Sequence, residues 1–179
     1  MTAFSEGEEN ERRLDWTILR DGSIALYRRD DFLEEAVNWL SSHGYRIVSF
    51  DCSDWCTSTQ MHDSLQHSLS FPSYYGGNLN ALNDCMCEDL EVPEVGGLVL
   101  VLRHYDRYSN GTHAAHNSGR SEAEIVLDIF ARASRYQMLK GRRLITLAQS
   151  GDPLIHFDNL DGVSATWNSR EWLNENRNL

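Results

Sequence analysis

The most constraining feature of the sequence is an unbroken apolar run, Gly97-Leu-Val-Leu-Val-Leu102. A strand with one wet face would alternate apolar and polar residues, so this run is typical of a strand that is covered on both faces. Shorter strand-like runs occur at Arg46–Phe50 and Leu144–Leu147, and helical patterns separate the three. Strands that alternate with helices indicate parallel βα units. The sequence therefore predicts an α/β fold.

Capping signals place the helices between these strands. One helix is expected from about Ser58 to Leu69, and another begins after Asn78, whose side chain can accept first-turn amide groups. A third follows Ser121, with Glu124 at the capping-box position, and runs to about Gln137. The polar segment Tyr105–Gly119, which contains His113 and His116, is predicted to be a loop.

Both ends of the chain lie outside this alternating pattern. We divide the sequence into a mobile acidic tail (1–13), an N-terminal hairpin-helix extension (14–44), the α/β domain (45–150) and a C-terminal extension packed on the core (151–179). Asp21-Gly22 predicts a hairpin within Trp16–Tyr27, since this pair favours a two-residue turn. Asp31 and Glu34 are placed as a capping box for a helix that stops at Gly44. In the last extension, Asp161-Gly162 predicts a second hairpin, and Arg170–Asn176 a terminal helix.

The formal net charge of −11 is distributed unevenly. Met1–Arg46 carries 10 acidic and 6 basic residues, and Arg103–Leu179 carries 9 acidic and 10 basic residues. Ile47–Leu102 carries 8 acidic residues and no Lys or Arg. Nucleic-acid binding requires Lys and Arg to displace counterions, so this segment argues against a nucleic-acid partner. It favours a basic protein as partner, which the negative field would steer towards it.

The sequence shows no signal peptide at its N-terminal end and no run long enough to span a membrane, so we expect a cytoplasmic protein with no membrane partner. In that compartment the four cysteines are expected to be free thiols. The spacings Cys52-x₃-Cys56 and Cys85-x-Cys87 lack the paired pattern of zinc sites, so no metal is predicted.

The segment Phe71–Leu90 carries the clearest functional signal. It joins a turn that displays two tyrosines to the helix that Asn78 caps. At 100° per residue, Leu79, Leu82 and Met86 form a buried stripe. The opposite side carries Asn80, Asn83, Asp84 and Cys87, with Glu88 at its edge. This face is small, polar and acidic, and no basic residue is near it in the sequence.

The same segment carries a family resemblance. Pro-x-Tyr-Tyr-Gly-x-Asn-Leu-x-Ala-Leu-x-Asp-Cys, at Pro72–Cys85, resembles the signature of barstar, the intracellular inhibitor of a secreted microbial ribonuclease. Weaker, mainly hydrophobic similarity extends the match to about Tyr45–Ser150. It includes Met61, His62, Leu65 and Leu69 in the preceding helix. The resemblance implies a small three-stranded parallel sheet with packed helices.

The resemblance also implies a function and a site. A barstar-like inhibitor, immunity protein or antitoxin would bind one-to-one to a basic, extracellular-type microbial ribonuclease or related toxin domain. It would block the active site with acidic side chains in place of RNA phosphates, and it would need no cofactor. Asp84 matches the central aspartate of that mechanism, and Tyr74 matches a tyrosine that packs on the nuclease. The expected partner-binding residues are Tyr74, Gly76, Asn80, Asn83, Asp84, Cys87 and Glu88.

Several residues depart from the family pattern. Asn80 stands where barstar has an acid, Asn83 replaces a large aromatic residue, and Arg132 falls where the family has a glutamate in its third helix. Such changes suit an inhibitor tuned to another target. They equally suit a non-catalytic interaction module on the same scaffold with a non-nuclease partner. An enzyme with a Cys–His nucleophile is a further alternative, but no motif marks one, so the chain is expected not to be an enzyme.

Overall fold

The computed structural model describes residues 13–111 and 119–179. Its strands are β1 (Ile24–Tyr27), β2 (Tyr45–Asp51), β3 (Gly97–Arg103), β4 (Leu144–Gln149) and β5 (Thr166–Trp167). Its helices are α1 (Leu14–Arg20), α2 (Asp30–Ser42), α3 (Ser58–Leu69), α4 (Leu79–Asp84), α5 (Tyr105–Ser109) and α6 (Glu122–Leu139). Shorter turns are η2 (Cys52–Asp54), η3 (Cys85–Asp89) and η4 (Asn174–Arg177). Residues 1–12 of the predicted mobile tail, and His113 and His116, lie outside the described residues.

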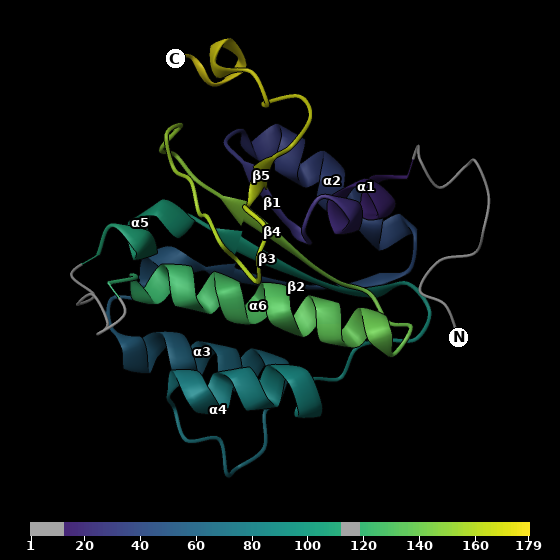
Figure 1. Ribbon diagram of the computed structural model, residues 1–179, viewed down its shortest axis with the longest axis vertical. Coiled ribbons are helices and arrows are strands. Elements are labelled where there is room, and N and C mark those ends of the chain that lie inside the picture. Colours follow the sequence, from purple (N-terminus) through teal and green to yellow (C-terminus); the bar gives the residue numbers. More distant parts are fainter. Residues whose placement is uncertain (1–12, 112–118) are drawn as a thin grey trace.

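The strands form one parallel sheet in the order β2-β3-β4-β1-β5 (Figure 1). The three predicted strands are confirmed as β2, β3 and β4, and β3 pairs on both sides as its apolar run requires. The predicted count of three strands is wrong, because β1 pairs with β4 and β5 pairs with β1. The two added strands belong to the N-terminal (14–44) and C-terminal (151–179) extensions.

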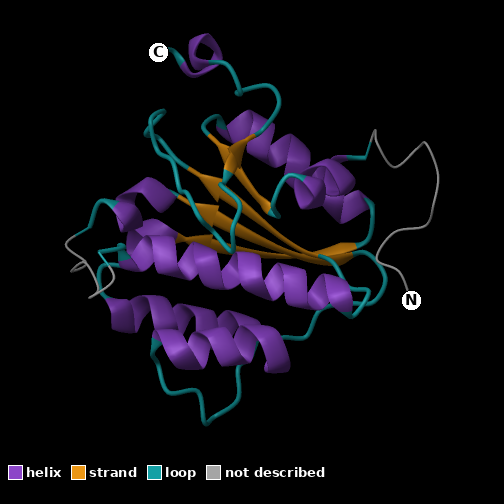
Figure 2. Cartoon of the chain, viewed as in Figure 1, coloured by secondary structure: helices purple, strands orange, loops and turns teal. Residues whose placement is uncertain are grey.

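Helices cover both faces of the sheet (Figure 2). One face packs against α3, α4 and α6 through a large apolar cluster that includes Met61, Leu82, Leu100 and Phe130. The other face packs against α1 and α2 through a second cluster centred on residues such as Leu33. Because β3 alternates its side chains between the two clusters, the whole of its apolar run is buried.

The predicted N-terminal hairpin is wrong. Its first arm is helix α1, and its Asp21-Gly22 pair ends that helix before β1 begins. Gly22 and Ser23 have φ angles of 125° and 68°, and the Ser23 amide donates to the Ile18 carbonyl at 2.9 Å. The predicted turn at Asp21-Gly22 is present, but β1 pairs with the distant strand β4, which a local pattern cannot reveal.

The start of helix α2 also differs from the prediction. Its N-cap residue is Arg29, and no side chain of its own first turn caps it, so the capping box of Asp31 and Glu34 is wrong. Instead the buried carboxylate of Glu171 accepts hydrogen bonds from the backbone amides of Arg28 and Arg29, at 2.9 and 3.0 Å. The stop at Gly44 is confirmed, since this residue follows the C-cap with a φ of 84°.

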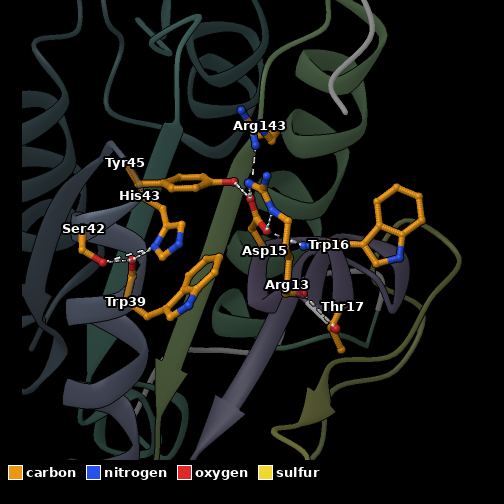
Figure 3. Close-up of polar contacts among 9 residues, drawn as sticks. All are labelled: Arg13, Asp15, Trp16, Thr17, Trp39, Ser42, His43, Tyr45 and Arg143. Atoms are coloured by element: carbon orange, nitrogen blue, oxygen red, sulfur yellow. Dashed lines mark hydrogen bonds and ion pairs between the residues drawn. The ribbon is translucent and has the colours of Figure 1, made fainter. Parts of the chain in front are cut away.

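A buried carboxylate, that of Asp15, joins helix α1 to the sheet (Figure 3). Asp15 accepts hydrogen bonds from the Tyr45 hydroxyl at 2.6 Å and from Arg143 at 3.1 Å, and it forms a bidentate pair with Arg13. Burial alone would raise the pKa of Asp15, but the hydrogen bonds from Arg13 and Tyr45 outweigh it and lower this pKa. Because Tyr45 begins β2 and Arg143 precedes β4, these contacts hold α1 against strands β2 and β4.

The C-terminal segment and the loop before α6 match the predictions only in part. The turn at Asp161-Gly162 is confirmed by mutual backbone bonds between Leu160 and Val163. The strand after it, however, pairs in parallel with β1, and the predicted terminal helix is only the turn η4. The predicted loop after β3 contains the short helix α5. Within the described residues, no helix combines the length and apolar character that a membrane span requires.

Candidate partner-binding surface

The loop before α4 displays only one of its two tyrosines. Tyr75 is 8% exposed, packs at 5.2 Å against Phe71 and forms a hydrogen bond with the buried His62. Tyr74 is 70% exposed, and its hydroxyl donates to Asp89 Oδ1 at 2.8 Å. This hydrogen bond raises the pKa of Tyr74. Tyr75 therefore anchors the loop, and Tyr74 presents an aromatic ring to solvent.

Helix α4 is capped as predicted. Asn78 Oδ1 accepts from the Ala81 amide at 3.0 Å, and Asn78 Nδ2 donates to the Gly76 carbonyl at 3.2 Å. The left-handed backbone angle of this loop belongs to Gly77, with a φ of 57°, and not to Gly76. A Cβ at Gly76 would instead lie 3.0 Å from Asn78 Nδ2, so this glycine leaves room for the cap.

The helix continues past Asp84 as a π-type turn, η3, closed by a bond of 2.8 Å from the Leu90 amide to the Cys85 carbonyl. Widened turns of this kind occur often at functional sites. Here the turn changes which residues face solvent. Cys87 is half-buried, and its carbonyl accepts from Gln137 Nε2 of α6 at 3.2 Å. The prediction that Cys87 lies on the exposed face is therefore wrong.

Asp84 and Asn80 do face solvent. Among the described residues, the Asp84 carboxylate contacts only the amide of Asn83, at 3.4 Å. Leu82 and Met86, on the other side of the same helix, are fully buried, and Leu79 is half-buried against the core. A rigid apolar face thus holds an exposed carboxylate, which keeps its capacity to accept hydrogen bonds from another molecule.

Helix α6 brings basic residues to the surface that looked purely acidic in the sequence. Glu88 accepts from the Tyr136 hydroxyl at 2.6 Å and lies 3.9 Å from Lys140 Nζ. Asn83 is half-buried, and its Oδ1 accepts from Arg132 at 3.3 Å. The surface therefore combines the open carboxylate of Asp84 with an acid that is already paired and a nearby guanidinium.

Sequence reasoning missed Tyr136 and Lys140 as members of this surface. Arg132 and Tyr136 of α6 and Lys140, the C-cap of this helix, recur at intervals of four residues, so they form one stripe. That spacing was visible in the sequence. What it could not show was that the stripe lies against η3.

The cysteines of this surface are poor nucleophiles. Burial, with a contribution from Asp89, raises the pKa of Cys85 to about 11, and burial next to Glu88 raises that of Cys87. Since the thiolate is the reactive form, both residues are largely unreactive thiols at neutral pH. Within residues 13–111 and 119–179, no three His, Cys, Asp or Glu side chains are grouped closely enough to hold a metal ion.

The fold and this surface define an α/β protein that exposes a polar helix, with one open carboxylate, on a firmly packed base. Comparison with known proteins agrees. The model of the family described as Barstar (barnase inhibitor) matches residues 45–149, more than half of the chain, and the chain belongs to this family. The matched residues contain β2, β3, β4 and the whole surface described above.

One curated relative is the Bacillus subtilis (strain 168) protein named "Putative ribonuclease inhibitor YrdF". The two are 38% identical over 65 residues, which is 36% of this chain and 66% of the relative. The alignment thus covers just under two thirds of that protein.

Proposed function

We propose that the chain inhibits a basic ribonuclease of the barnase type, or a related toxin domain, by covering its active site one-to-one with the surface around Asp84. The observation that carries this proposal is the open carboxylate of Asp84, held on a capped helix within the family-matched residues. Carboxylates of this kind accept strong, charge-assisted hydrogen bonds from the arginine and histidine side chains of a phosphate-binding site. In a cell that makes such a ribonuclease, the chain would act as an immunity protein.

Charge supports the same partner. The base-free segment Ile47–Leu102 supplies the loop of Tyr74, helix α4 and the turn η3. Its negative field would steer a basic nuclease towards this side of the molecule, and such steering weakens as salt screens the charges. Association that slows markedly with rising ionic strength is therefore expected.

Firm packing adds a second reason. Because Leu82 and Met86 are fully buried and Tyr75 is bonded to His62, the backbone that carries Asp84 is already ordered before a partner arrives. A preordered surface loses less conformational entropy on binding, so more of the interaction energy appears as affinity.

A titration into a barnase-type ribonuclease assay tests the proposal. The chain should inhibit with a stoichiometric end point, and Asp84→Asn should abolish this while leaving the fold intact. Asp158→Asn provides the charge-matched control, since Asp158 is an exposed carboxylate outside the family-matched residues and contacts Ser164. Equal losses in both variants would indicate a general charge effect and would count against a specific role for Asp84.

The second candidate is a non-catalytic interaction module with a partner other than a nuclease. The position of Arg132 and Lys140 favours it, because they place positive charge beside Asn83 and Glu88. Binding to an identified partner that lacks nuclease activity, with the same dependence on Asp84, would favour this candidate over the inhibitor.

A further inference from the structure

A cavity of about 380 Å³ lies between α1, α2 and the segment 166–172. Helices α1 and α2 lie on the side of the sheet away from α4 (Figure 1). Every residue of its lining falls within 14–39 or 166–172. None belongs to residues 45–149, which the family model matches. The cavity is therefore built by the two segments that this chain carries in addition to the family-matched part, and it is separate from the surface around Asp84.

The walls of the cavity are aromatic. They include Phe32, Trp39, Trp167 and Trp172. Two of these rings are fixed by neighbours: Trp39 stacks on His43 with ring centroids 3.7 Å apart, and the Arg170 guanidinium lies 3.4 Å from the Phe32 centroid. Walls held in this way can contact a flat ring without first becoming ordered.

The charges of the lining compensate one another. Its four charged residues form two ion pairs, Arg20 with Asp21 at 2.7 Å and Arg170 with Glu35 at 2.6 Å. A ligand with a net charge would gain no uncompensated counter-ion here. The lining therefore favours an uncharged molecule.

The lining includes one tyrosine, Tyr27. Tyr27, the last residue of β1, is only 2% exposed and shares its face of the strand with Ala25, which also lines the cavity. The structure gives its hydroxyl no hydrogen bond to any residue of 13–111 or 119–179. Burial raises the pKa of Tyr27, so the hydroxyl stays protonated at neutral pH and can donate. An acceptor on a bound molecule would give this hydroxyl a direct hydrogen-bond partner.

We propose that this cavity binds an uncharged, planar aromatic molecule that carries a hydrogen-bond acceptor for the Tyr27 hydroxyl. The volume is in the range of about 300–1,000 Å³ that small-molecule sites occupy. The proposal does not depend on the inhibitor function, because the two sites share no residue.

Quinoline and naphthalene form a matched pair of probes. Both are flat bicyclic molecules that are uncharged at pH 8, and only quinoline has a ring nitrogen that accepts a hydrogen bond. The full chain, labelled with ¹⁵N, would be titrated with each probe, and the indole N–H signals of the tryptophans would be followed by NMR. Both probes should bind saturably, and quinoline should bind more tightly.

Two variants locate the site. Tyr27→Phe removes a hydroxyl that has no described partner, so the fold should persist; it should weaken quinoline binding about 2- to 10-fold, the range for one net hydrogen bond, and leave naphthalene unchanged. Trp172→Ala removes an exposed wall and should weaken both probes. Leu173→Ala, at the neighbouring exposed position outside the lining, is the control and should weaken neither.

Three results would overturn the proposal. One is the absence of saturable binding. Another is a Tyr27→Phe variant that binds quinoline as tightly as the unmodified chain does. The third is a Leu173→Ala variant that weakens both probes as much as Trp172→Ala does, since the lining would then not account for the binding.

Discussion

Replacement of Asp15 by alanine should destabilise the protein severely, because this carboxylate is completely buried and has several partners. It accepts from Tyr45, from Arg143 and twice from Arg13, and it also accepts from the Trp16 amide at 2.9 Å. Breaking a buried ion pair by removing one member costs about 3–5 kcal/mol. Here Arg143, whose side chain is 15% exposed, would lose the Asp15 carboxylate in a poorly solvated place, whereas Arg13, at 35%, keeps more contact with water. A loss of that size is a large fraction of the ~5–15 kcal/mol that stabilises a typical domain.

Urea unfolding would measure the loss. With a slope of roughly 2 kcal/mol per molar urea, the midpoint should fall by about 1.5–2.5 M. Asp31→Ala is the matched control, because Asp31 forms the same bidentate pair with an arginine two residues before it, Arg29, but at the surface. Exposed pairs contribute little, so the midpoint of this variant should stay close to that of the unmodified chain. Equal shifts of the midpoint in the two variants would show that burial of the ion pair does not determine the size of the loss.

The Asp15 carboxylate should also make the free energy of unfolding depend on pH. The pKa of Asp15 is lower in the folded protein than its ordinary value of about 3.9. Its contribution to the free energy of unfolding is therefore fully present above that ordinary value and is lost as the pH falls through the lowered folded pKa. The difference in stability between the unmodified chain and Asp15→Asn should consequently shrink below about pH 4.

Three further predictions concern single side chains. Asn78→Ala removes the α4 cap and should lower the free energy of unfolding by about 1 kcal/mol, whereas Asn78→Gly should cost only a few tenths; equal losses in urea unfolding would argue against capping. Glu171→Ala removes the buried carboxylate that accepts from two backbone amides at the start of α2 and should cost about 1–3 kcal/mol in the same assay, and a neutral result would show that water replaces the carboxylate. Glu88→Gln should weaken ribonuclease inhibition less than Asp84→Asn does, because Glu88 is already bonded to Tyr136; the reverse order in a titration would move the centre of the site.

The parts of the fold that the sequence predicted correctly are those with local signals. The apolar run Gly97–Leu102 indicated the central strand without reference to its partners. The capping box of Ser121 and Glu124 is present at the start of α6, and Asn78 caps α4. In each case the residues that determine the structure lie within one turn or one strand of each other.

The elements that were predicted wrongly depend on residues that are distant in the sequence. The start of α2 is capped by Glu171, which no pattern near Asp31 could reveal. The residues of β1 become a strand because β4 and β5 lie on either side of them, and the same short apolar stretch fits a hairpin equally well when read alone. The number of strands was therefore wrong although the fold class was right.

In the candidate surface, too, the features of a single helix were predicted correctly and those that depend on tertiary contacts were not. Periodicity placed Asp84 in solvent and Leu82 in the core correctly. It misplaced Cys87, because the helix widens at η3 and because α6 covers that side. The contact of Glu88 with Lys140 is likewise a tertiary feature, although the spacing of the α6 residues hinted that they share a face.

We propose that Asp84 is the main point of contact between the chain and a ribonuclease active site. The most direct measurement is the affinity of the chain for a purified barnase-type ribonuclease, compared with that of Asp84→Ala, at low and at high salt. We expect tight one-to-one binding that the substitution weakens by about 2–5 kcal/mol, or roughly 30-fold to 4,000-fold, with association slower at high salt. Tight binding that Asp84→Ala leaves unchanged would contradict the claim, and the absence of binding would leave the chain in its family with a different partner.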